Sequence, residues 1–231
     1  MSLSISAHPS PLLAALFPPG VRAAEQRQPG DAALLYPEEA AHLRQAISKR
    51  VGEFAAGRLC ARQALAQLGI VDFPLLVGSD RRPQWPEEVV GSITHTQGFG
   101  GAVVAPREHY RGIGVDAEVV GRVKPALWEK ICTPQEIAWL EQLAGREQER
   151  LGALVFSAKE AFYKCQYGLT ESWVGFQDVM LDPADCDWRG GRFSVLPLKA
   201  LQLERLLTPP WTGSFRFEES LVVSGISFAA T

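Results

Sequence analysis

Cysteine is scarce in this sequence, and the few cysteines are not grouped. The 231 residues contain four, Cys60, Cys132, Cys165 and Cys186, and no two of them form a Cys-x-x-Cys pair. Zinc sites and disulfide frameworks need closer groupings of cysteine, so we expect neither. The pattern favours reduced, isolated thiols.

Long hydrophobic runs are also lacking. The apolar residues 12–17 form a short run that ends at Pro18 and Pro19, and the residues before them lack the basic start of a signal peptide. No stretch approaches the ~20 apolar residues that span a bilayer. We therefore expect a cytoplasmic protein with no membrane segment.

Charge of one sign is not in excess either. The sequence carries 23 Lys and Arg against 26 Asp and Glu, a formal net charge of −3. Domains that bind nucleic acid generally have a basic surface, so this composition argues against such a partner. A chain of this length can form one domain or two small ones. No internal repeat is visible by sequence identity, although the order helix, strand, strand recurs loosely in each half.

Residues 156–164, Phe-Ser-Ala-Lys-Glu-Ala-Phe-Tyr-Lys, have the pattern of a helix centre. Apolar side chains recur there at helical spacing and predict a buried face, at Leu151, Leu154, Val155, Ala158, Phe162 and Cys165. Glu160 and Lys164 share another face, and Lys159 is beside them. A carboxylate between two lysines can bind a metal or take a proton, and lysines can neutralise phosphate charge. An ordinary surface ion pair is the alternative.

Two acidic residues stand at alternate positions in residues 112–120, Gly-Ile-Gly-Val-Asp-Ala-Glu-Val-Val. Alternate positions of a strand share a face, so Asp116 and Glu118 are predicted to point the same way. Their oxygen atoms suit a hard cation. A solvent-facing strand with two acids is the alternative.

Three arginines mark a helix predicted from Ser48, its N-cap, to Leu68. Arg58 and Arg62 project from the middle of its apolar side, and Arg50 lies close by on the same helix. A guanidinium in such a place needs a buried acid, backbone carbonyls or a bound anion as its partner. We favour anion binding over arginines that bridge to carboxylates or extend to a rim.

A basic loop follows a strand predicted over residues 71–77. Arg81, Arg82 and Pro83 stand in this loop, with Trp85 close behind. Such a loop can touch phosphate and stack on an adenine. An exposed turn is the alternative.

His95 comes next, between Thr94 and Thr96, and we predict it at a turn between two short strands. The small residues and glycines around it allow a ligand to approach the backbone closely. We therefore favour a ligand-binding histidine over a structural one.

Together these motifs resemble the 4′-phosphopantetheinyl transferases. Gly-Val-Asp-Ala-Glu at residues 114–118 precedes the helical motif in the family's order, and Lys-Arg-x-x-Glu-Phe-x-x-Gly-Arg-x-x-x-Arg stands at residues 49–62. The basic loop before Pro83 and the Thr-His element match as well. The larger type, associated with surfactin and enterobactin synthases, is the better match. Recognisable motifs cover residues 48–168, and Ala117 departs from the isoleucine that is frequent in its place.

The resemblance implies an α+β fold of two similar halves related by a pseudo-twofold axis. The active site would lie in the cleft between them. Residues 1–114 would form the half that binds the phosphates of coenzyme A, and residues 115–231 the half with the metal and catalytic residues. The resemblance also implies a monomer.

The implied reaction transfers the 4′-phosphopantetheine group of coenzyme A to a serine of an apo acyl or peptidyl carrier protein. It needs Mg²⁺, with Mn²⁺ as a substitute, and releases 3′,5′-adenosine bisphosphate. Asp116, Glu118 and Glu160 would hold the metal. Glu160 would take the serine proton, directly or through a metal-bound water, and Lys164 and Lys159 would stabilise charge. The expected contacts to coenzyme A are Arg50, Arg58, Arg62, Arg81, Arg82, Pro83, Thr94, His95, Thr96, Asp116 and Lys164.

Two other functions stay open at this point. A metal-dependent phosphoester or pyrophosphate hydrolase would use the same acids, and a non-catalytic module would bind coenzyme A without chemistry. The carrier is expected to be acidic, but fatty-acid, polyketide, siderophore and other peptide synthesis are all compatible with the motifs. Either Arg81 or Arg82 could be the basic residue that contacts coenzyme A.

Overall fold

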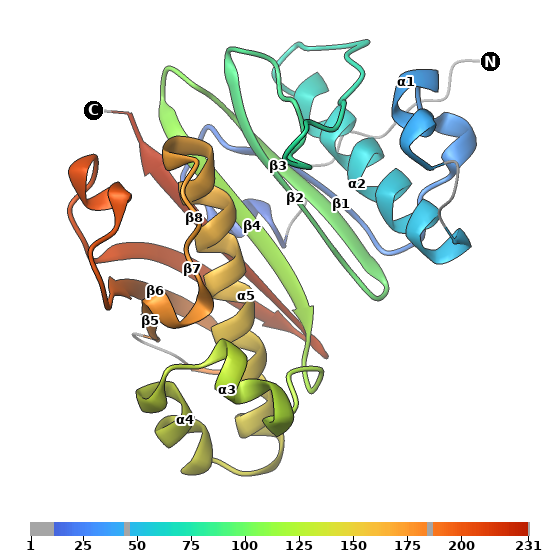
Figure 1. The fold of residues 1–231 in the computed structure, drawn as a ribbon. Coiled ribbons are helices and arrows are strands. Elements are labelled where there is room, and N and C mark those ends of the chain that lie inside the picture. Colours follow the sequence, from blue (N-terminus) through green and yellow to red (C-terminus); the bar gives the residue numbers. More distant parts are fainter. Residues whose placement is uncertain (1–11, 44–46, 184–186, 231) are drawn as a thin grey trace.

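Two antiparallel sheets form the framework of the protein, and a long helix packs on each of them (Figure 1). The computed structural model describes residues 12–43, 47–183 and 187–230. The strand order is β1-β3-β2 in the first sheet and β4-β8-β7-β6-β5 in the second. The strands are β1 (Arg22–Gln26), β2 (Val89–Thr96), β3 (Phe99–Pro106), β4 (Tyr110–Val119), β5 (Val179–Asp182), β6 (Gly190–Pro197), β7 (Trp211–Glu218) and β8 (Leu221–Ala229). This architecture is of the expected α+β class.

The two long helices are α2 (Ser48–Ala66) and α5 (Gly145–Thr170). All six apolar positions predicted for the core-facing side of α5 are buried. The N-cap of α2 is Ile47, whose side chain has no hydrogen-bonding group, so the prediction of Ser48 as the cap is wrong. The shorter segments are α1 (Pro37–Ala40), α3 (Trp128–Ile131), α4 (Pro134–Glu141) and the 3-10 turns η1 (Ala14–Leu16), η2 (Ala32–Leu34), η3 (Ala41–Leu43), η4 (Pro125–Leu127), η5 (Phe176–Asp178) and η6 (Gln202–Arg205).

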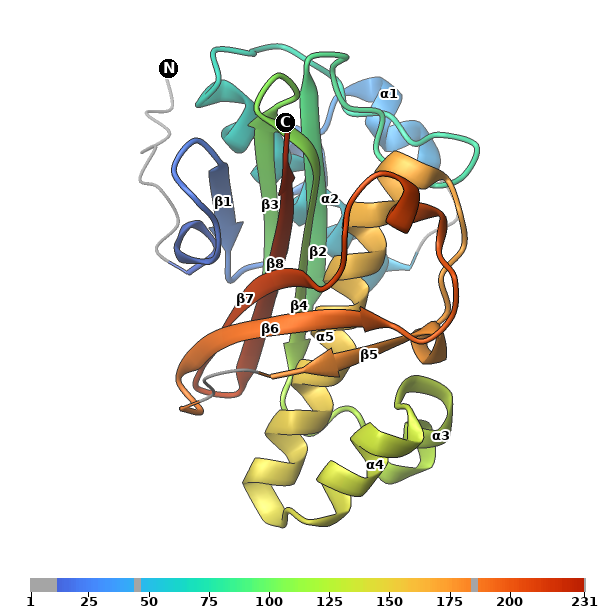
Figure 2. The same ribbon diagram turned by 90° about the vertical axis from the view of Figure 1, so that its left-hand side faces the viewer.

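The two halves repeat one order of elements. In the first half β1 precedes α2, the hairpin of β2 and β3 follows it, and β3 lies in the middle of the sheet. In the second half β4 precedes α5, the hairpin of β7 and β8 follows, and β8 lies between β4 and β7. β5 and β6 extend the second sheet beyond this shared pattern, and Figure 2 shows them crossing β4 and β8 steeply. The repeat agrees with an arrangement of two similar halves.

The strand β4 belongs to the second half over its whole length, because it pairs with β8 from Tyr110 to Val119. The sheets therefore divide between Pro106, where β3 ends, and Tyr110. The division placed after residue 114 from the sequence lies inside β4. The division into domains of residues 1–114 and 115–231 stays a prediction.

Three hydrophobic clusters stabilise these layers. One lies under α2, one lies under α5, and the third lies between the two sheets. Their fully buried members include Leu65 and Val104 for the first, Phe162, Phe193 and Phe215 for the second, and Leu13, Val103 and Val223 for the third. Burial of each such side chain contributes about 1.5–3 kcal/mol to the free energy of unfolding. The third cluster joins the halves and fixes how they face each other.

Two local predictions are wrong. Residues 71–77 form no strand, and within them only Val77 makes a single β-bridge, to Pro83. Asp72 has a φ of +55°, which an extended strand does not allow, and Pro74 lacks an N–H for a ladder. His95 lies within β2 rather than at a turn, and the chain turns two residues later, where Gly98 has a φ of +74°.

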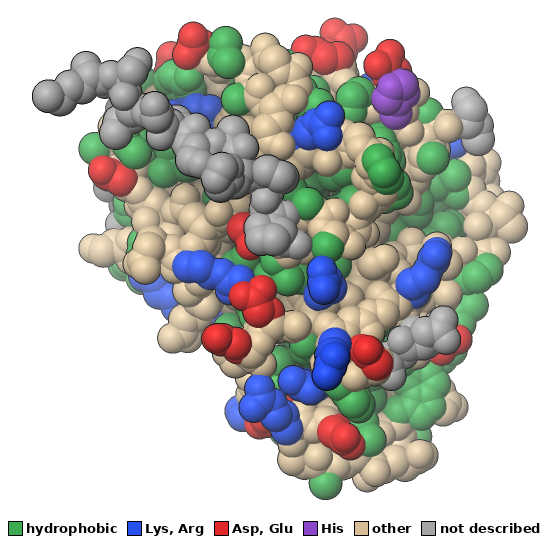
Figure 3. All heavy atoms as spheres, turned by 180° about the vertical axis from the view of Figure 1, so that it is seen from behind, with side chains coloured by type: hydrophobic (Ala, Val, Ile, Leu, Met, Phe, Trp, Pro, Cys, Tyr) green, Lys and Arg blue, Asp and Glu red, His purple; other side chains and the backbone are tan. Residues whose placement is uncertain are grey.

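One face of the protein carries charged side chains of both signs. Figure 3 shows one face on which Lys and Arg side chains are interspersed with Asp and Glu, so this face presents no extended basic region of the kind that binds nucleic acid. Within the described residues, no helix combines the length and the apolar character that crossing a membrane requires.

Candidate active site

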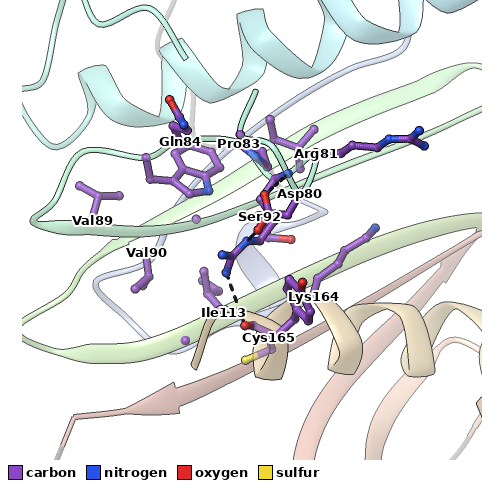
Figure 4. A pocket seen from close by; sticks show the side chains of 18 of the residues that line it. Asp80, Arg81, Pro83, Gln84, Val89, Val90, Ser92, Ile113, Lys164 and Cys165 are labelled. Carbon is purple, nitrogen blue, oxygen red and sulfur yellow. Dashed lines mark hydrogen bonds and ion pairs between the residues drawn. The ribbon is translucent and has the colours of Figure 1, made fainter. Parts of the chain in front are cut away.

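A cleft lies between the halves, where β2 runs beside β4. It consists of two cavities of about 640 and 670 Å³, which share Ile93 and Lys164 in their walls. The first cavity lies between the loop of residues 78–85 and the end of α5, and Figure 4 shows Arg81 and Pro83 of this loop with Lys164 of α5. The second cavity contains the three predicted carboxylates.

Hydroxyl side chains of β2 join the two halves along the cleft. β2 and β4 belong to different sheets, yet Ser92 Oγ accepts a hydrogen bond from the Val115 N–H at 3.1 Å. Two residues further along each strand, Thr94 Oγ1 accepts one from the Ala117 N–H at 2.9 Å. The hydroxyls stand at alternate positions, so they share the face of β2 that meets β4.

The same row of hydroxyls orients the acids of β4. Thr94 Oγ1 donates to Asp116 Oδ1 at 3.3 Å, and Thr96 Oγ1 donates to Glu118 Oε1 at 3.3 Å. All four side chains are buried. Asp116 and Glu118 therefore point the same way into the cleft, as the alternation predicted.

Glycine in β4 lets α5 approach closely enough to complete the site. A Cβ atom on Gly114 would lie 1.9 Å from the carbonyl oxygen of Ala161, so no larger residue fits there without moving α5. From α5, Lys164 Nζ donates to Asp116 Oδ1 at 2.6 Å and to the Val115 carbonyl at 3.2 Å. The ion pair between Lys164 and Asp116 thus spans the helix and the strand.

Glu160 is half-buried beside these groups, one helical turn before Lys164. Burial raises the pKa of Glu160, the Lys164 ammonium opposes this shift, and the negative charges of Asp116 and Glu118 add to it. Burial also raises the pKa of Glu118. A carboxylate whose pKa is raised is a better proton acceptor, which suits Glu160 to general-base chemistry.

A second group of charges lies where α2 meets the end of β2. Arg50 Nη1 lies 3.0 Å from His95 Nε2, and His95 Nδ1 lies 3.8 Å from Glu53 Oε2. Burial lowers the pKa of His95, which favours the neutral ring, with Arg50 donating to Nε2 and the Nδ1 proton facing Glu53. Arg50 and His95 both line the second cavity, so the structure brings them to the acids as expected.

The two arginines of the basic loop differ in their surroundings. Arg82 binds Asp80, donates to Glu171 Oε1 at 3.0 Å, and stacks over the Tyr167 ring at 4.8 Å. It therefore ties the loop to the end of α5. Arg81 lines the first cavity with a φ of +68°, and among the described residues its guanidinium has no hydrogen-bond or ion-pair partner. Arg81 is the more available of the two for a ligand.

The structure does not bring Arg58 and Arg62 to the cavities. Arg62 Nη2 binds Glu39 at 3.0 Å and its guanidinium stacks on the Tyr36 ring at 4.0 Å. Arg58 is 5% exposed and lies over the Phe54 ring at 4.4 Å. Burial lowers the pKa of Arg58 to about 10, which the charge of Glu39 opposes. Arg62 is therefore bridged to a carboxylate, which was the alternative to anion binding in the sequence analysis.

Lys159 also stands apart from the expected catalytic groups. Its side chain is 1% exposed, and its ammonium group binds Glu136 Oε2 at 2.6 Å. Helical geometry explains this, because consecutive residues point about 100° apart while residues four apart nearly coincide. Of the three expected groups, the structure brings Glu160 and Lys164 together and leaves Lys159 in a buried ion pair.

The donor set of the second cavity fits a hard cation. Asp116 Oδ2 is buried and has no hydrogen-bond partner in the described structure, and Asp116, Glu118 and Glu160 offer oxygen atoms alone. Glu118 Oε1 is engaged by the Val119 N–H at 2.6 Å and lies 3.6 Å from Arg122. Among the described residues, no three His, Cys, Asp or Glu side chains already converge as a metal-binding group.

Sequence reasoning did not assign several residues that line the second cavity: Ile47, Lys49, Glu53, Phe156 and Arg122. Arg122 donates to Thr96 Oγ1 at 3.2 Å and follows Gly121, whose φ is +88°. A basic residue just after a glycine turn that ends an acidic strand is a signal that could have been used. Phe156 carries no such signal, because an aromatic residue in a helix is more often part of a core.

A small hollow of about 70 Å³ adjoins Glu160, and it was also missed. Tyr163, Trp173 and Phe176 are among its walls. Trp173 is 75% exposed and packs edge-on against Tyr163 at 5.1 Å. Aromatic side chains therefore adjoin Glu160 in this hollow, and one of them, Tyr163, also lines the first cavity.

Comparison with known proteins agrees with the geometry. The family model "4'-phosphopantetheinyl transferase N-terminal domain" matches residues 38–105, and "4'-phosphopantetheinyl transferase superfamily" matches residues 112–211. 4'-Phosphopantetheinyl transferase Svp of Streptomyces mobaraensis is 40% identical over 208 residues, which cover 85% of this chain and 80% of Svp. The chain belongs to the 4′-phosphopantetheinyl transferase superfamily. The resemblance seen in the motifs is thereby confirmed.

Other members of the superfamily show the same relation. 4'-Phosphopantetheinyl transferase Npt of Nocardia iowensis is 35% identical over 226 residues, 94% of this chain and 100% of Npt. Enterobactin synthase component D of Escherichia coli (strain K12) is 37% identical over 152 residues, 64% of this chain and 69% of that protein. The similarity to the latter supports assignment to the larger, enterobactin-synthase-associated type of the superfamily.

Proposed function

We propose that this protein transfers the 4′-phosphopantetheine group of coenzyme A to a serine of an apo acyl or peptidyl carrier protein. The serine oxygen attacks the phosphorus that carries the pantetheine arm. The bond from this phosphorus to the bridging pyrophosphate oxygen breaks, and 3′,5′-adenosine bisphosphate leaves. The serine proton passes to a base on the enzyme. The observation that carries the proposal is the cluster of Asp116, Glu160 and Lys164 in the cleft.

The basic residues on the first-half side of the cleft suit the adenosine bisphosphate part of coenzyme A. Arg50 presents a guanidinium beside the acids, next to the ring of His95, and Arg81 presents a second cation in the adjoining cavity. Charge-assisted hydrogen bonds to phosphate are stronger than neutral ones. The shared wall at Ile93 and Lys164 would let one extended ligand occupy both cavities.

Glu160 is the base in this proposal. A serine hydroxyl is a weak nucleophile at neutral pH, so a proton acceptor has to lie within hydrogen-bond reach. In the metal-free protein, burial raises the pKa of Glu160, which makes its carboxylate a better proton acceptor. Lys164 already faces Asp116 at 2.6 Å and would offset charge that develops on the phosphates.

Asp116 and Glu160 would hold Mg²⁺ in this site, with Glu118 as the third expected ligand. The orphaned oxygen of Asp116 supports this assignment. When bound, the cation would offset the negative charge of the pyrophosphate.

The aromatic hollow beside Glu160 suits part of the pantetheine arm. The arm is an uncharged chain of methylene, methyl and amide groups, and the group that is transferred has to lie next to the base. Tyr163, Trp173 and Phe176 offer apolar surface at that place.

The carrier would meet the open mouth of the second cavity. Lys49, Arg50 and Arg122 line this cavity and are exposed. Their positive charges complement an acidic carrier and would speed its approach.

The test is the intact mass of an apo acyl or peptidyl carrier protein after incubation with this protein, coenzyme A and Mg²⁺. We expect a gain of one phosphopantetheine group, and no gain when EDTA is present. Breakdown of coenzyme A without any carrier would instead identify a hydrolase. Tight binding of coenzyme A without modification of several carriers would identify a binding module.

A further inference from the structure

A fully buried carboxylate outside the cleft organises the second half. Glu136 is 0% exposed, yet its two oxygen atoms accept hydrogen bonds from three directions. The donors are the Thr133 N–H at 2.7 Å, the Leu181 N–H at 2.7 Å and Lys159 Nζ at 2.6 Å. Glu136 thereby joins the start of α4, the strand β5 and the helix α5.

Lys159 completes this group, which we call the Glu136 hub. Its ammonium group has three hydrogen atoms and three partners: Glu136, the Ile131 carbonyl at 3.1 Å and the Phe176 carbonyl at 2.7 Å. Burial lowers the pKa of Lys159, and the charge of Glu136 opposes the shift. With every donor used, Lys159 has no hydrogen left for substrate, and its position is fixed from several sides.

The first half contains a hub of the same construction. Glu39 is 1% exposed and accepts from the Tyr36 N–H at 3.1 Å, the Leu75 N–H at 2.9 Å and Arg62 at 3.0 Å. In both hubs the glutamate is the third residue of a short helix that begins with proline. The basic partner lies on the long helix, 23 residues after the glutamate in each case.

The two hubs differ in what stands beside them. In the first half the residue after Arg62 is Gln63, which lines neither cavity of the cleft. In the second half the residue after Lys159 is Glu160, the proposed base. The second hub also holds the carbonyl of Phe176, whose side chain forms part of the aromatic hollow. An arrangement that both halves contain therefore adjoins the proposed reacting groups in the second half alone.

We propose that Glu136 is a positioning residue for the transfer reaction. Through Lys159 it fixes the rotation of α5 that turns Glu160 into the cleft, and through Phe176 it fixes the wall beside Glu160. The proposal rests on the proposed function. It assigns the adjacent Lys159 to positioning, in place of the direct catalytic role expected from the motif.

The test compares Glu136→Gln with a matched control, Glu39→Gln. Both variants neutralise a buried carboxylate that holds a helix start, a later backbone N–H and a basic residue. Each is measured below its own melting temperature for kcat, KM and the Kd for coenzyme A. Because a misplacement of 1 Å at reacting groups can cost ~100-fold in rate, we expect kcat of Glu136→Gln to fall by about 10- to 100-fold. Its Kd for coenzyme A should change by no more than about twofold, since most proposed contacts lie on the first half.

The control decides between positioning and stability. Glu39→Gln should lose thermal stability and keep kcat near that of the wild type. Equal losses of kcat in both variants, or no loss in either, would overturn the proposal. A wild-type protein that modifies no carrier would overturn the proposed function and the positioning role together, before any variant is compared.

A second variant covers the case in which Glu136→Gln does not fold. Lys159→Arg keeps the buried ion pair, and the first half shows that this construction accepts an arginine in the equivalent place. The Lys159 side chain is 1% exposed where that of Arg62 is 27% exposed, so the longer side chain has less room here. It should displace α5 and lower kcat with the Kd for coenzyme A retained. A wild-type kcat in Lys159→Arg, with the protein folded, would also overturn the proposal.

Discussion

The close contact between β4 and α5 makes a sharp prediction for Gly114→Ala. The new Cβ atom would lie 1.9 Å from the carbonyl oxygen of Ala161 and 2.8 Å from the backbone nitrogen of Cys165. Both are backbone atoms, so no side chain can rotate away to make room. To restore an ordinary contact of 3.4 Å, α5 would have to move by about 1.5 Å.

Two consequences of this shift can be given magnitudes. Overpacking of this kind typically costs about 1–3 kcal/mol of unfolding free energy. For a chain of this length, each kcal/mol lowers Tm by about 2–4 °C. The shift also carries Glu160 and Lys164 away from Asp116, and a displacement of that size at reacting groups costs ~100-fold in kcat.

The matched control is Gly152→Ala on the same helix. A Cβ atom on Gly152 would lie 3.6 Å from the carbonyl oxygen of Val123 and 3.8 Å from Cδ2 of Leu140, which are ordinary contacts. Alanine in place of glycine stabilises a helix by about 1 kcal/mol, so Tm should rise slightly and kcat should not change. Thermal unfolding and the carrier-modification assay measure both variants. If Gly114→Ala kept the Tm and kcat of the wild type, the reasoning from helix position to catalysis would be refuted.

Other predictions concern the charged groups. Glu160→Gln should bind coenzyme A as the wild type does, measured by calorimetry, and should transfer nothing measurable to the carrier, measured by intact mass. Transfer at the wild-type rate would show that Glu160 is not the base. Without divalent cations, Glu160→Gln should also be more stable than the wild type at neutral pH. Burial raises the pKa of Glu160, so its ionised form destabilises the fold above that pKa, and urea unfolding in EDTA should show the advantage disappear in acid. Arg81→Ala should raise the Kd for coenzyme A about 10-fold, the loss of one charge-assisted hydrogen bond. Arg82→Ala should mainly lower Tm, since Arg82 is bound to Glu171. A higher Kd for coenzyme A in Arg82→Ala than in Arg81→Ala would contradict this assignment.

Local patterns predicted the parts of the site that lie within one element. The alternation in β4 placed Asp116 and Glu118 on one face, and the four-residue spacing in α5 placed Glu160 with Lys164. Both follow from the period of a strand or a helix, which the sequence contains directly.

Partners that lie far apart in sequence could not be predicted in this way. We expected Lys159 and Arg62 at the active site, and no local pattern indicates that they bind Glu136 and Glu39 instead, each 23 residues upstream. The strand expected at residues 71–77 failed for a local reason, the positive φ of Asp72. Apolar residues were present, but no neighbouring strand paired with them.

The row of hydroxyls on β2 fixes the register in which β2 of the first half lies against β4 of the second half. Backbone ladders can slip by two residues and keep the same face inward, whereas the three hydroxyls of this contact have different sets of partners. Ser92 binds a backbone N–H, Thr94 binds a backbone N–H and Asp116, and Thr96 binds Glu118 and Arg122. A slip by one residue would replace these hydroxyls with groups that carry no hydroxyl in register and would leave two N–H groups of β4 buried without an acceptor. The halves can therefore dock productively in a single alignment. That alignment also sets the distance from the basic residues of one half to the acids of the other.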